Sequence, residues 1–138
     1  MGLTLTRSVS FFARHRLYRP EWSPERNRAA FGPLSEEPGH GHDYTCAVTV
    51  RGAPDAPPDL IVDLPALDRI LRDEVVAPCE GKYLNREHPA FAATLPTCEA
   101  LAAHFFARIA ARLPAGTRLE RVRVSEDPTL HADCTGLP

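Results

Sequence analysis

The chain is 138 residues long with a formal net charge of −2, and its length fits one domain spanning residues 1–138. The slight acidity argues against a nucleic-acid partner, because duplex-binding domains usually carry a basic excess. No apolar run approaches the roughly 18 residues of a membrane span, and the N-terminus lacks the basic start and apolar stretch of a signal peptide. The four cysteines are scattered and form no Cys-x-x-Cys pair. We therefore expect free thiols in a cytoplasmic protein without a membrane partner.

The first half of the chain predicts two strands around a long insertion. Residues 3–13 are rich in Thr, Val and Phe, which is typical of a strand. Residues 17–41 hold several prolines and a short helical stretch over 24–31. An insertion of this length in a compact domain usually has a binding role or is disordered. Residues 42–51 alternate like a second strand, and residues 53–58 predict the turn after it.

The second half predicts two amphipathic helices separated by a loop. Asp63 reads as the N-cap of a helix whose apolar positions repeat at helical spacing as far as Val75. We expect a loop from about residue 78 to residue 96. Thr97 then caps a second helix, which ends before Pro114.

Two further strands complete the expected fold. One begins at Leu119, and residues 129–135 predict the other. The order β-β-α-α-β-β favours an α+β domain, in which a four-stranded antiparallel sheet carries two helices on one face. Such a sheet leaves two edges as templates for pairing, which is a physical hint of oligomerisation.

Histidines provide the strongest chemical signal. His40 and His42 lie two residues apart in a predicted strand, so both imidazoles point to the same face. Flanking glycines let the backbone turn tightly and keep the site open. His15 follows the first strand and comes close to this pair if the two strands are antiparallel neighbours. Three neutral imidazoles with one open position are the arrangement of a catalytic zinc site, whereas the alternative is a set of exposed loop histidines.

These residues belong to a longer pattern that resembles the 6-pyruvoyl-tetrahydropterin synthase and 6-carboxy-tetrahydropterin synthase family. The first half of the pattern consists of Phe11-x-Ala13-x-His15-Arg-Leu, Trp22-Ser-Pro-Glu-Arg-Asn-Arg-Ala-Ala-Phe31-Gly32 and Gly39-His40-Gly41-His42-Asp-Tyr44. The second half consists of Ile61-Val62-Asp63-Leu64, Lys82-Tyr83-Leu84-Asn85, Pro96-Thr97-x-Glu99, Val124-x-Glu126 and Gly136. The resemblance covers nearly the whole chain in order.

The resemblance implies a fold, a cofactor and a reaction. The family has the tunnelling fold, in which three subunits close a barrel and two trimers commonly stack, so it implies a homotrimer or homohexamer with sites between subunits. It implies zinc on His15, His40 and His42, holding the side-chain oxygens of a reduced pterin. It also implies elimination of triphosphate from dihydroneopterin triphosphate, followed by rearrangement of the side chain.

Glu126 and Thr97 are the candidate pterin-binding residues. The resemblance makes Glu126 the anchor of the pterin ring, and a carboxylate can accept two parallel N–H bonds from such a ring edge. Without the resemblance, Glu126 would read as an exposed glutamate at a strand end. Thr97 is a secondary pterin-contact candidate, although a helix cap explains it more simply.

Two proton-transfer positions depart from the family. The cysteine that serves as general base aligns with Leu34, and the Asp-His pair aligns with Glu80 and Gly81. Losing a positioned general base typically costs about a hundred- to ten-thousand-fold in rate. Glu36 or Glu37 can take the place of the cysteine, as a glutamate does in a minor branch of the family, and Glu80 can take that of the aspartate.

Other outcomes stay open. The chain can run a reaction that needs fewer proton transfers, or bind a pterin without turning it over, or be a structural oligomer with adventitious metal. The sequence leaves the pterin product undecided. His131 has the parity to return to the pocket, whereas His88 and His104 read as a loop residue and a helix-surface residue. Cys46 and Cys98 read as core residues.

Overall fold

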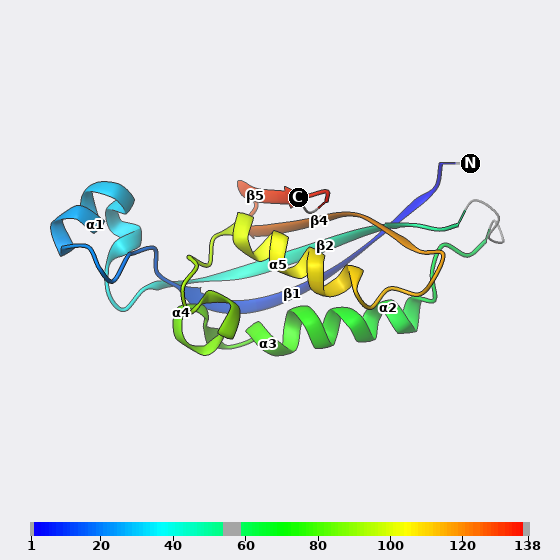
Figure 1. The fold of residues 1–138 in the computed structure, drawn as a ribbon, viewed down its shortest axis with the longest axis horizontal. Helices are drawn as coiled ribbons and strands as arrows, with labels where there is room; N and C mark the ends of the chain where they lie inside the picture. Colours follow the sequence, from blue (N-terminus) through cyan, green and yellow to red (C-terminus); the bar gives the residue numbers. More distant parts are fainter. Residues whose placement is uncertain (1, 54–58, 137–138) are drawn as a thin grey trace.

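A twisted sheet of five strands forms the frame of the molecule, in the order β3-β1-β2-β4-β5 (Figure 1). The computed structural model describes residues 2–53 and 59–136. The strands are β1 (Thr4–His15), β2 (His40–Arg51), β3 (Lys82–Tyr83), β4 (Arg118–Asp127) and β5 (Leu130–Cys134). The four expected strands are all present; β1 and β2 each extend two residues beyond the expected end nearest the histidines, and β5 is slightly shorter than expected.

Helical segments fill the connections between the strands. They are α1 (Pro24–Phe31), η1 (Gly32–Ser35), α2 (Leu64–Leu71), η2 (Arg72–Val76), α3 (Ala77–Cys79), α4 (Leu84–Glu87), η3 (Pro89–Phe91) and α5 (Cys98–Ala110). The turn expected over residues 53–58 lies almost entirely outside the described residues. None of the helices in the described ranges is long and apolar enough to cross a membrane.

The four-stranded sheet predicted from sequence is wrong by one strand. β3 pairs with β1 in parallel, through Ala13–Lys82 and Arg14–Tyr83. A two-residue strand carries too little alternation to be recognised, and its position depends on tertiary contacts. The expected loop 78–96 also contains the short helices α4 and η3.

Both long helices start where the capping residues predict. The Asp63 carboxylate accepts a hydrogen bond from the Ala66 N–H, and the Thr97 hydroxyl accepts one from the Ala100 N–H. The helix that begins with α2 continues past its expected end. A wider turn at η2, in which the Ala77 N–H donates to the Arg72 carbonyl, carries it on into α3.

Helices α2, α3 and α5 pack on one face of the sheet, and that face holds the core, whereas α1 lies beyond one end of the sheet (Figure 1). Phe11, Tyr44, Val48 and Val122 point from the strands into this layer and are buried. On β1, the alternate residues on the opposite face are polar and exposed as far as Ser10. The strand alternation therefore decides which side chains face the helices, and His15, His40 and His42 share the parity of the core residues.

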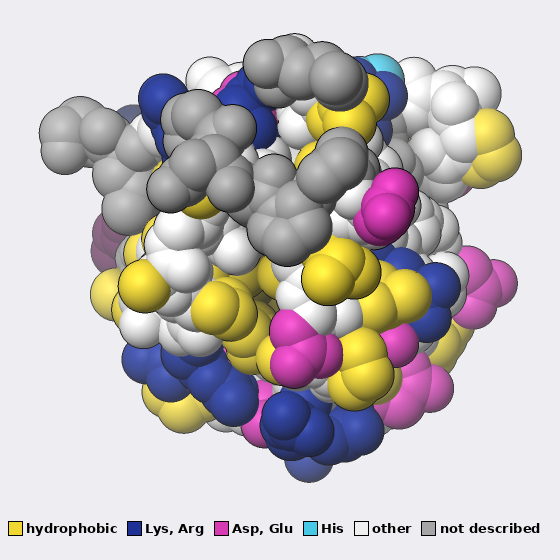
Figure 2. All heavy atoms as spheres, turned by 90° about the vertical axis from the view of Figure 1, so that its right-hand side faces the viewer, with side chains coloured by type: hydrophobic (Ala, Val, Ile, Leu, Met, Phe, Trp, Pro, Cys, Tyr) yellow, Lys and Arg dark blue, Asp and Glu magenta, His cyan; other side chains and the backbone are white. Residues whose placement is uncertain are grey.

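An apolar patch lies at the end of the molecule away from α1 (Figure 2). It surrounds a hollow of about 660 Å³ whose walls include residues 60–65 and Pro114. β1 starts at this end and reaches His15 only at the other. The apolar patch and the histidines are thus at opposite ends of the sheet.

Candidate metal centre

Three histidines converge where β1 ends and β2 begins. His15 is the last residue of β1 and pairs directly with His40, the first residue of β2, while His42 pairs with Ala13. The ring centroids of His15 and His40 are 4.5 Å apart, those of His15 and His42 5.1 Å, and those of His40 and His42 4.9 Å. One ring nitrogen from each lies within 4.8 Å of the others. The predicted antiparallel pairing and shared face are confirmed.

Gly39 makes this approach possible. Its φ is +88°, a left-handed conformation that favours glycine, and a Cβ there would lie 2.6 Å from the His15 carbonyl oxygen. Gly41 acts differently from the expectation that it keeps the site open. A Cβ on Gly41 would meet the ring of Phe12, which lies on the face away from the histidines.

His15 is oriented by a second layer of contacts. Its side chain is only 2% exposed, and Nδ1 lies 2.7 Å from the Pro96 carbonyl oxygen, to which it donates. The Tyr44 hydroxyl lies 3.2 Å from the same nitrogen. A proton fixed on Nδ1 leaves the lone pair on Nε2. This second ring nitrogen is on the side of His15 toward the other two histidines. Sequence reasoning missed both partners, although Tyr44 has the strand parity of His42.

Burial disfavours the charged forms of His15 and His40. Burial lowers the pKa of His15 to about 4; the hydrogen bond to Pro96 opposes that shift, and the neighbouring histidines add to it. Burial also lowers the pKa of His40, with smaller effects from His42 and Arg14. Neutral imidazole is the form that binds a metal ion.

His42 supplies a direct test of whether a metal fits. Its Nε2 atom is buried and has no hydrogen-bond partner among the described residues. A buried polar atom without a partner is unfavourable and calls for an explanation. A divalent cation held by the three histidines would satisfy this nitrogen, and an all-imidazole set suits zinc, copper, iron or nickel.

Glu126 brings a carboxylate to the same place from β4. Its side chain is 16% exposed, and Oε2 lies 3.9 Å from Nε2 of His15 and 3.8 Å from Nε2 of His42. Both distances exceed a hydrogen bond, so the carboxylate stands beside the imidazoles without being held by them. Thr97 directly follows Pro96 in the chain, but its hydroxyl caps α5.

The three glutamates predicted to be catalytic make their described contacts with groups outside the histidine cluster. Glu37 is 79% exposed and pairs with the Arg16 guanidinium at 3.2 Å. Glu36 is exposed, and its carbonyl accepts from the Gly39 N–H at 2.9 Å. Glu80 accepts a hydrogen bond from the Phe12 backbone N–H at 2.8 Å. In the described parts of the chain, these carboxylates share no hydrogen bond or ion pair with the metal-binding candidates.

The remaining sequence candidates are separated from the site. His131 pairs with Ser125 and faces the helix-free side of the sheet, so it does not return to the pocket. His104 lies on α5 and is partly exposed. His88 lies between α4 and η3, but it is buried against His104 and Phe91 rather than exposed.

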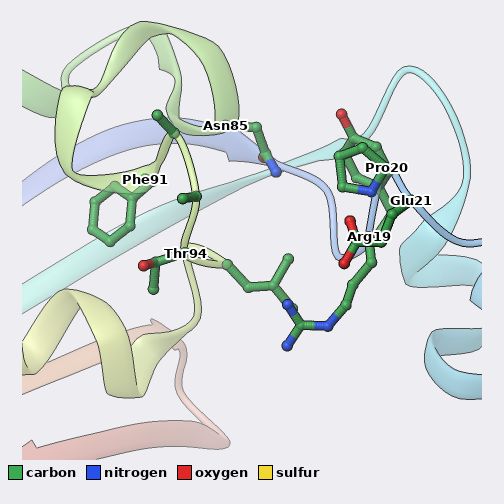
Figure 3. Close-up of a pocket in the computed structure, with 10 residues that line it drawn as sticks. Arg19, Pro20, Glu21, Asn85, Phe91 and Thr94 are labelled. Atoms are coloured by element: carbon green, nitrogen blue, oxygen red, sulfur yellow. The ribbon is translucent and has the colours of Figure 1, made fainter.

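A separate cavity of about 310 Å³ lies beyond the end of β1 (Figure 3). Arg19 reaches across it toward the segment that carries Thr94. Asn85 stands in its wall and binds both backbone groups of Arg16, each at 2.8 Å. The cavity therefore adjoins the segment that follows His15 but contains none of the three histidines.

The protein has one mostly antiparallel sheet with helices on one face, and three histidines cluster at the end of a strand. These features define an α+β protein with a candidate metal centre. The family model described as 6-pyruvoyl tetrahydropterin synthase matches residues 4–136. The chain belongs to this family.

Individual relatives agree with the family match. The chain is 34% identical over 122 residues to 6-pyruvoyl tetrahydrobiopterin synthase of Homo sapiens, covering 88% of this chain and 83% of that protein. It is 32% identical over 124 residues to the Drosophila melanogaster protein of the same name, covering 90% and 74%. The solved structure of Caenorhabditis elegans 6-pyruvoyl tetrahydropterin synthase superposes with a TM-score of 0.87 at 28% identity, covering 98% and 96%.

Proposed function

We propose that the chain binds one zinc ion through His15, His40 and His42 and processes a reduced pterin that carries a phosphorylated side chain. The observation that carries the proposal is the convergence of three imidazoles within 4.8 Å of one another, with the Glu126 carboxylate beside two of them. Membership of the 6-pyruvoyl tetrahydropterin synthase family supports the substrate class.

The chain's own residues would bind and orient the substrate. Glu126 offers two oxygens to the N–H groups along one edge of the pterin ring, and its partly buried position strengthens such charge-assisted bonds. The three histidines would hold the zinc at a fixed point relative to that anchor. When bound, zinc polarises the side-chain oxygens of the substrate and makes the neighbouring protons more acidic.

Proton transfer is where this chain differs from the sequence pattern of its family. Triphosphate elimination requires a group that takes a proton from the substrate's side chain, and Glu37 is our candidate, with Glu36 as the second choice. Glu37 lies in the turn that leads into His40 and is held at the surface by Arg16. Its action would require that it leave Arg16 when substrate enters. Glu80 is the weakest candidate, because its carboxylate is already bonded to the backbone of β1.

The test is incubation of zinc-loaded protein with dihydroneopterin triphosphate, with release of triphosphate and formation of a new pterin measured together. We expect zinc-dependent release that is lost in Glu126→Gln and reduced at least tenfold in Glu37→Gln. No release from the unmodified protein, in the presence of full zinc occupancy, would contradict the lyase proposal.

A second function, binding without turnover, is favoured by one specific observation. Leu34 stands in η1 at the position aligned with the family's cysteine, and its apolar side chain cannot accept a proton. Saturable pterin binding with no product would establish this alternative. A Glu37-dependent reaction would exclude it.

We further propose that the chain works as a homotrimer or homohexamer. Only the Ala13–Arg14 end of β1 pairs with β3, and β5 forms the other edge of the sheet. Two open edges on one sheet support pairing between subunits, which would enclose the histidines at a subunit boundary. Sedimentation or light scattering on the zinc-loaded protein tests this, and a monomer at micromolar concentration would contradict it.

A further inference from the structure

Cys98 touches the carboxylate that lies beside the three histidines. It is the first residue of α5, and its Sγ atom lies 3.8 Å from Oε2 of Glu126, within the range of a sulfur hydrogen bond. The residue is only 3% exposed. The sequence predicts a core position here, so this contact is a finding of the fold.

The contact has a defined direction. Burial raises the pKa of the Cys98 thiol to about 12, and the charge of Glu126 adds to this shift. The sulfur therefore keeps its proton at neutral pH and is a donor, while the carboxylate oxygen accepts. A thiol is a weak donor, but a bond to an ionised acceptor inside the protein is stronger than one in water.

Few other groups compete for this oxygen. The two imidazole nitrogens that face Oε2 lie 3.8 Å and 3.9 Å away, which is beyond a nitrogen–oxygen hydrogen bond. Among the described residues, the Cys98 thiol is the side-chain donor bonded to Glu126. This side-chain hydrogen bond to the carboxylate thus comes from a residue outside the histidine cluster.

We propose that Cys98 is a positioning residue, whose thiol orients the Glu126 carboxylate so that its free oxygen and its bonded oxygen both face an incoming planar N–H pair. The proposal rests on the proposed function for the identity of the ligand, a reduced pterin. The thiol–carboxylate bond itself is independent of that identity. A serine would keep a donor at this place, whereas an alanine would leave the carboxylate without one.

The bond can be tested without any pterin through the S–H stretching band in the infrared. Subtracting the spectrum of Cys98→Ser from that of the unmodified protein isolates the Cys98 band. We expect it at lower frequency than the band of Cys46, a buried thiol on β2 isolated in the same way with Cys46→Ser. Glu126→Gln should move the Cys98 band to higher frequency and leave the Cys46 band in place. A Cys98 band whose frequency is the same in Glu126→Gln as in the unmodified protein would overturn the proposal.

The consequence for ligand binding is measured with dihydroneopterin, which carries no phosphate to eliminate. We expect Cys98→Ala to bind it about five- to twenty-fold more weakly, Cys98→Ser to restore binding to within about threefold, and zinc content to stay unchanged in both. Cys46→Ala controls for the loss of a buried sulfur and should bind normally. Equal binding by Cys98→Ala and the unmodified protein would refute the positioning role. Failure of the unmodified protein to bind any pterin would instead refute the proposed function, and the infrared result would still decide the thiol–carboxylate bond.

Discussion

His15 and His40 face each other directly across the β1–β2 pair, with ring centroids 4.5 Å apart, although residues 16–39 separate them in the chain. The intervening segment leaves the sheet at His15, forms α1 and η1, and returns at His40 (Figure 1). A backbone bond from the Leu17 N–H to the Leu34 carbonyl, at 3.0 Å, closes its base. The strand register therefore brings the metal-binding candidates together, and Gly39 at the end of the excursion allows their close approach.

Replacing Gly39 by alanine should damage the histidine cluster. The left-handed backbone costs a non-glycine residue about 1–2 kcal/mol, and the new Cβ would press on the His15 carbonyl 2.6 Å away. We expect zinc affinity to fall at least about tenfold, as measured by competition with a chelator. Gly32→Ala is the matched control, because Gly32 also has a positive φ but its Cβ would meet nothing within 4 Å. Equal zinc affinity in the two variants would show that the close approach at Gly39 is unimportant.

Zinc stoichiometry should depend on the clustered histidines alone. We expect one zinc ion per chain after dialysis in the unmodified protein and a nearly complete loss in His40→Ala and in His42→Ala. His131→Ala should keep full occupancy, because His131 lies on the opposite face of the sheet. Metal analysis by mass spectrometry, together with a circular dichroism spectrum to verify folding, provides the measurement. Retention of zinc by folded His42→Ala would contradict the three-histidine site.

Strand alternation explains why the histidine cluster could be predicted from the sequence. Once His40 and His42 are in one strand, their shared face follows, and pairing with the strand that ends at His15 completes the set. The strand β3 at the edge of the sheet could not be predicted, because two residues show no periodicity. Nor could the bond between Glu80 and the Phe12 backbone, which depends on how the end of α3 meets β1.

The same limit applies to the second layer of the site. Pro96 contributes only its carbonyl oxygen to His15, and a backbone acceptor leaves no mark in residue type. The Cys98 thiol reaches Glu126 because α5 starts beside β4, a tertiary relationship that helix periodicity does not encode. The sequence thus predicts the three histidines and Glu126, and the packing decides which other groups orient them.

Restoring the family's proton-transfer groups should increase turnover. The double substitution Leu34→Cys and Gly81→His places a thiol and an imidazole at the aligned positions, and a positioned general base is worth roughly a hundred- to ten-thousand-fold. Gly81 has a φ of +71°, so a side chain there costs about 1–2 kcal/mol, a cost that the control variant below shares. We expect triphosphate release to rise by at least about tenfold in this variant. Leu34→Ser with Gly81→Asn controls for polarity. An unchanged rate with intact zinc and pterin binding would show that these two positions do not limit the reaction.

Acid should destabilise the fold partly through the buried His88 and its partly exposed neighbour His104. Burial lowers the pKa of both histidines. The charge of Arg108 lowers the pKa of His104 further, whereas the charge of Glu74 raises it. The unfolded chain, with a histidine pKa of about 6.5, therefore binds protons before the folded chain does, and stability falls as pH drops below that value.

Asparagine at position 88 removes one titrating group while keeping a side-chain acceptor for the Ala90 N–H. We expect the free energy of unfolding of His88→Asn to depend less steeply on pH below about 6.5 than that of the unmodified protein. Urea titrations of the metal-free protein across this range give the two slopes. Parallel slopes would show that His88 carries no share of the acid sensitivity.

The most direct test of the account is zinc K-edge X-ray absorption on the zinc-loaded protein, recorded before and after addition of dihydroneopterin. The account predicts three imidazole nitrogens at about 2.0–2.1 Å and no sulfur ligand, with a change in the light-atom shell when the pterin arrives. The same addition to Glu126→Gln should leave the spectrum unchanged. Two results would contradict a zinc centre that holds a pterin anchored by Glu126. One is a sulfur ligand to the zinc, and the other is a spectrum of the unmodified protein that does not change at saturating pterin.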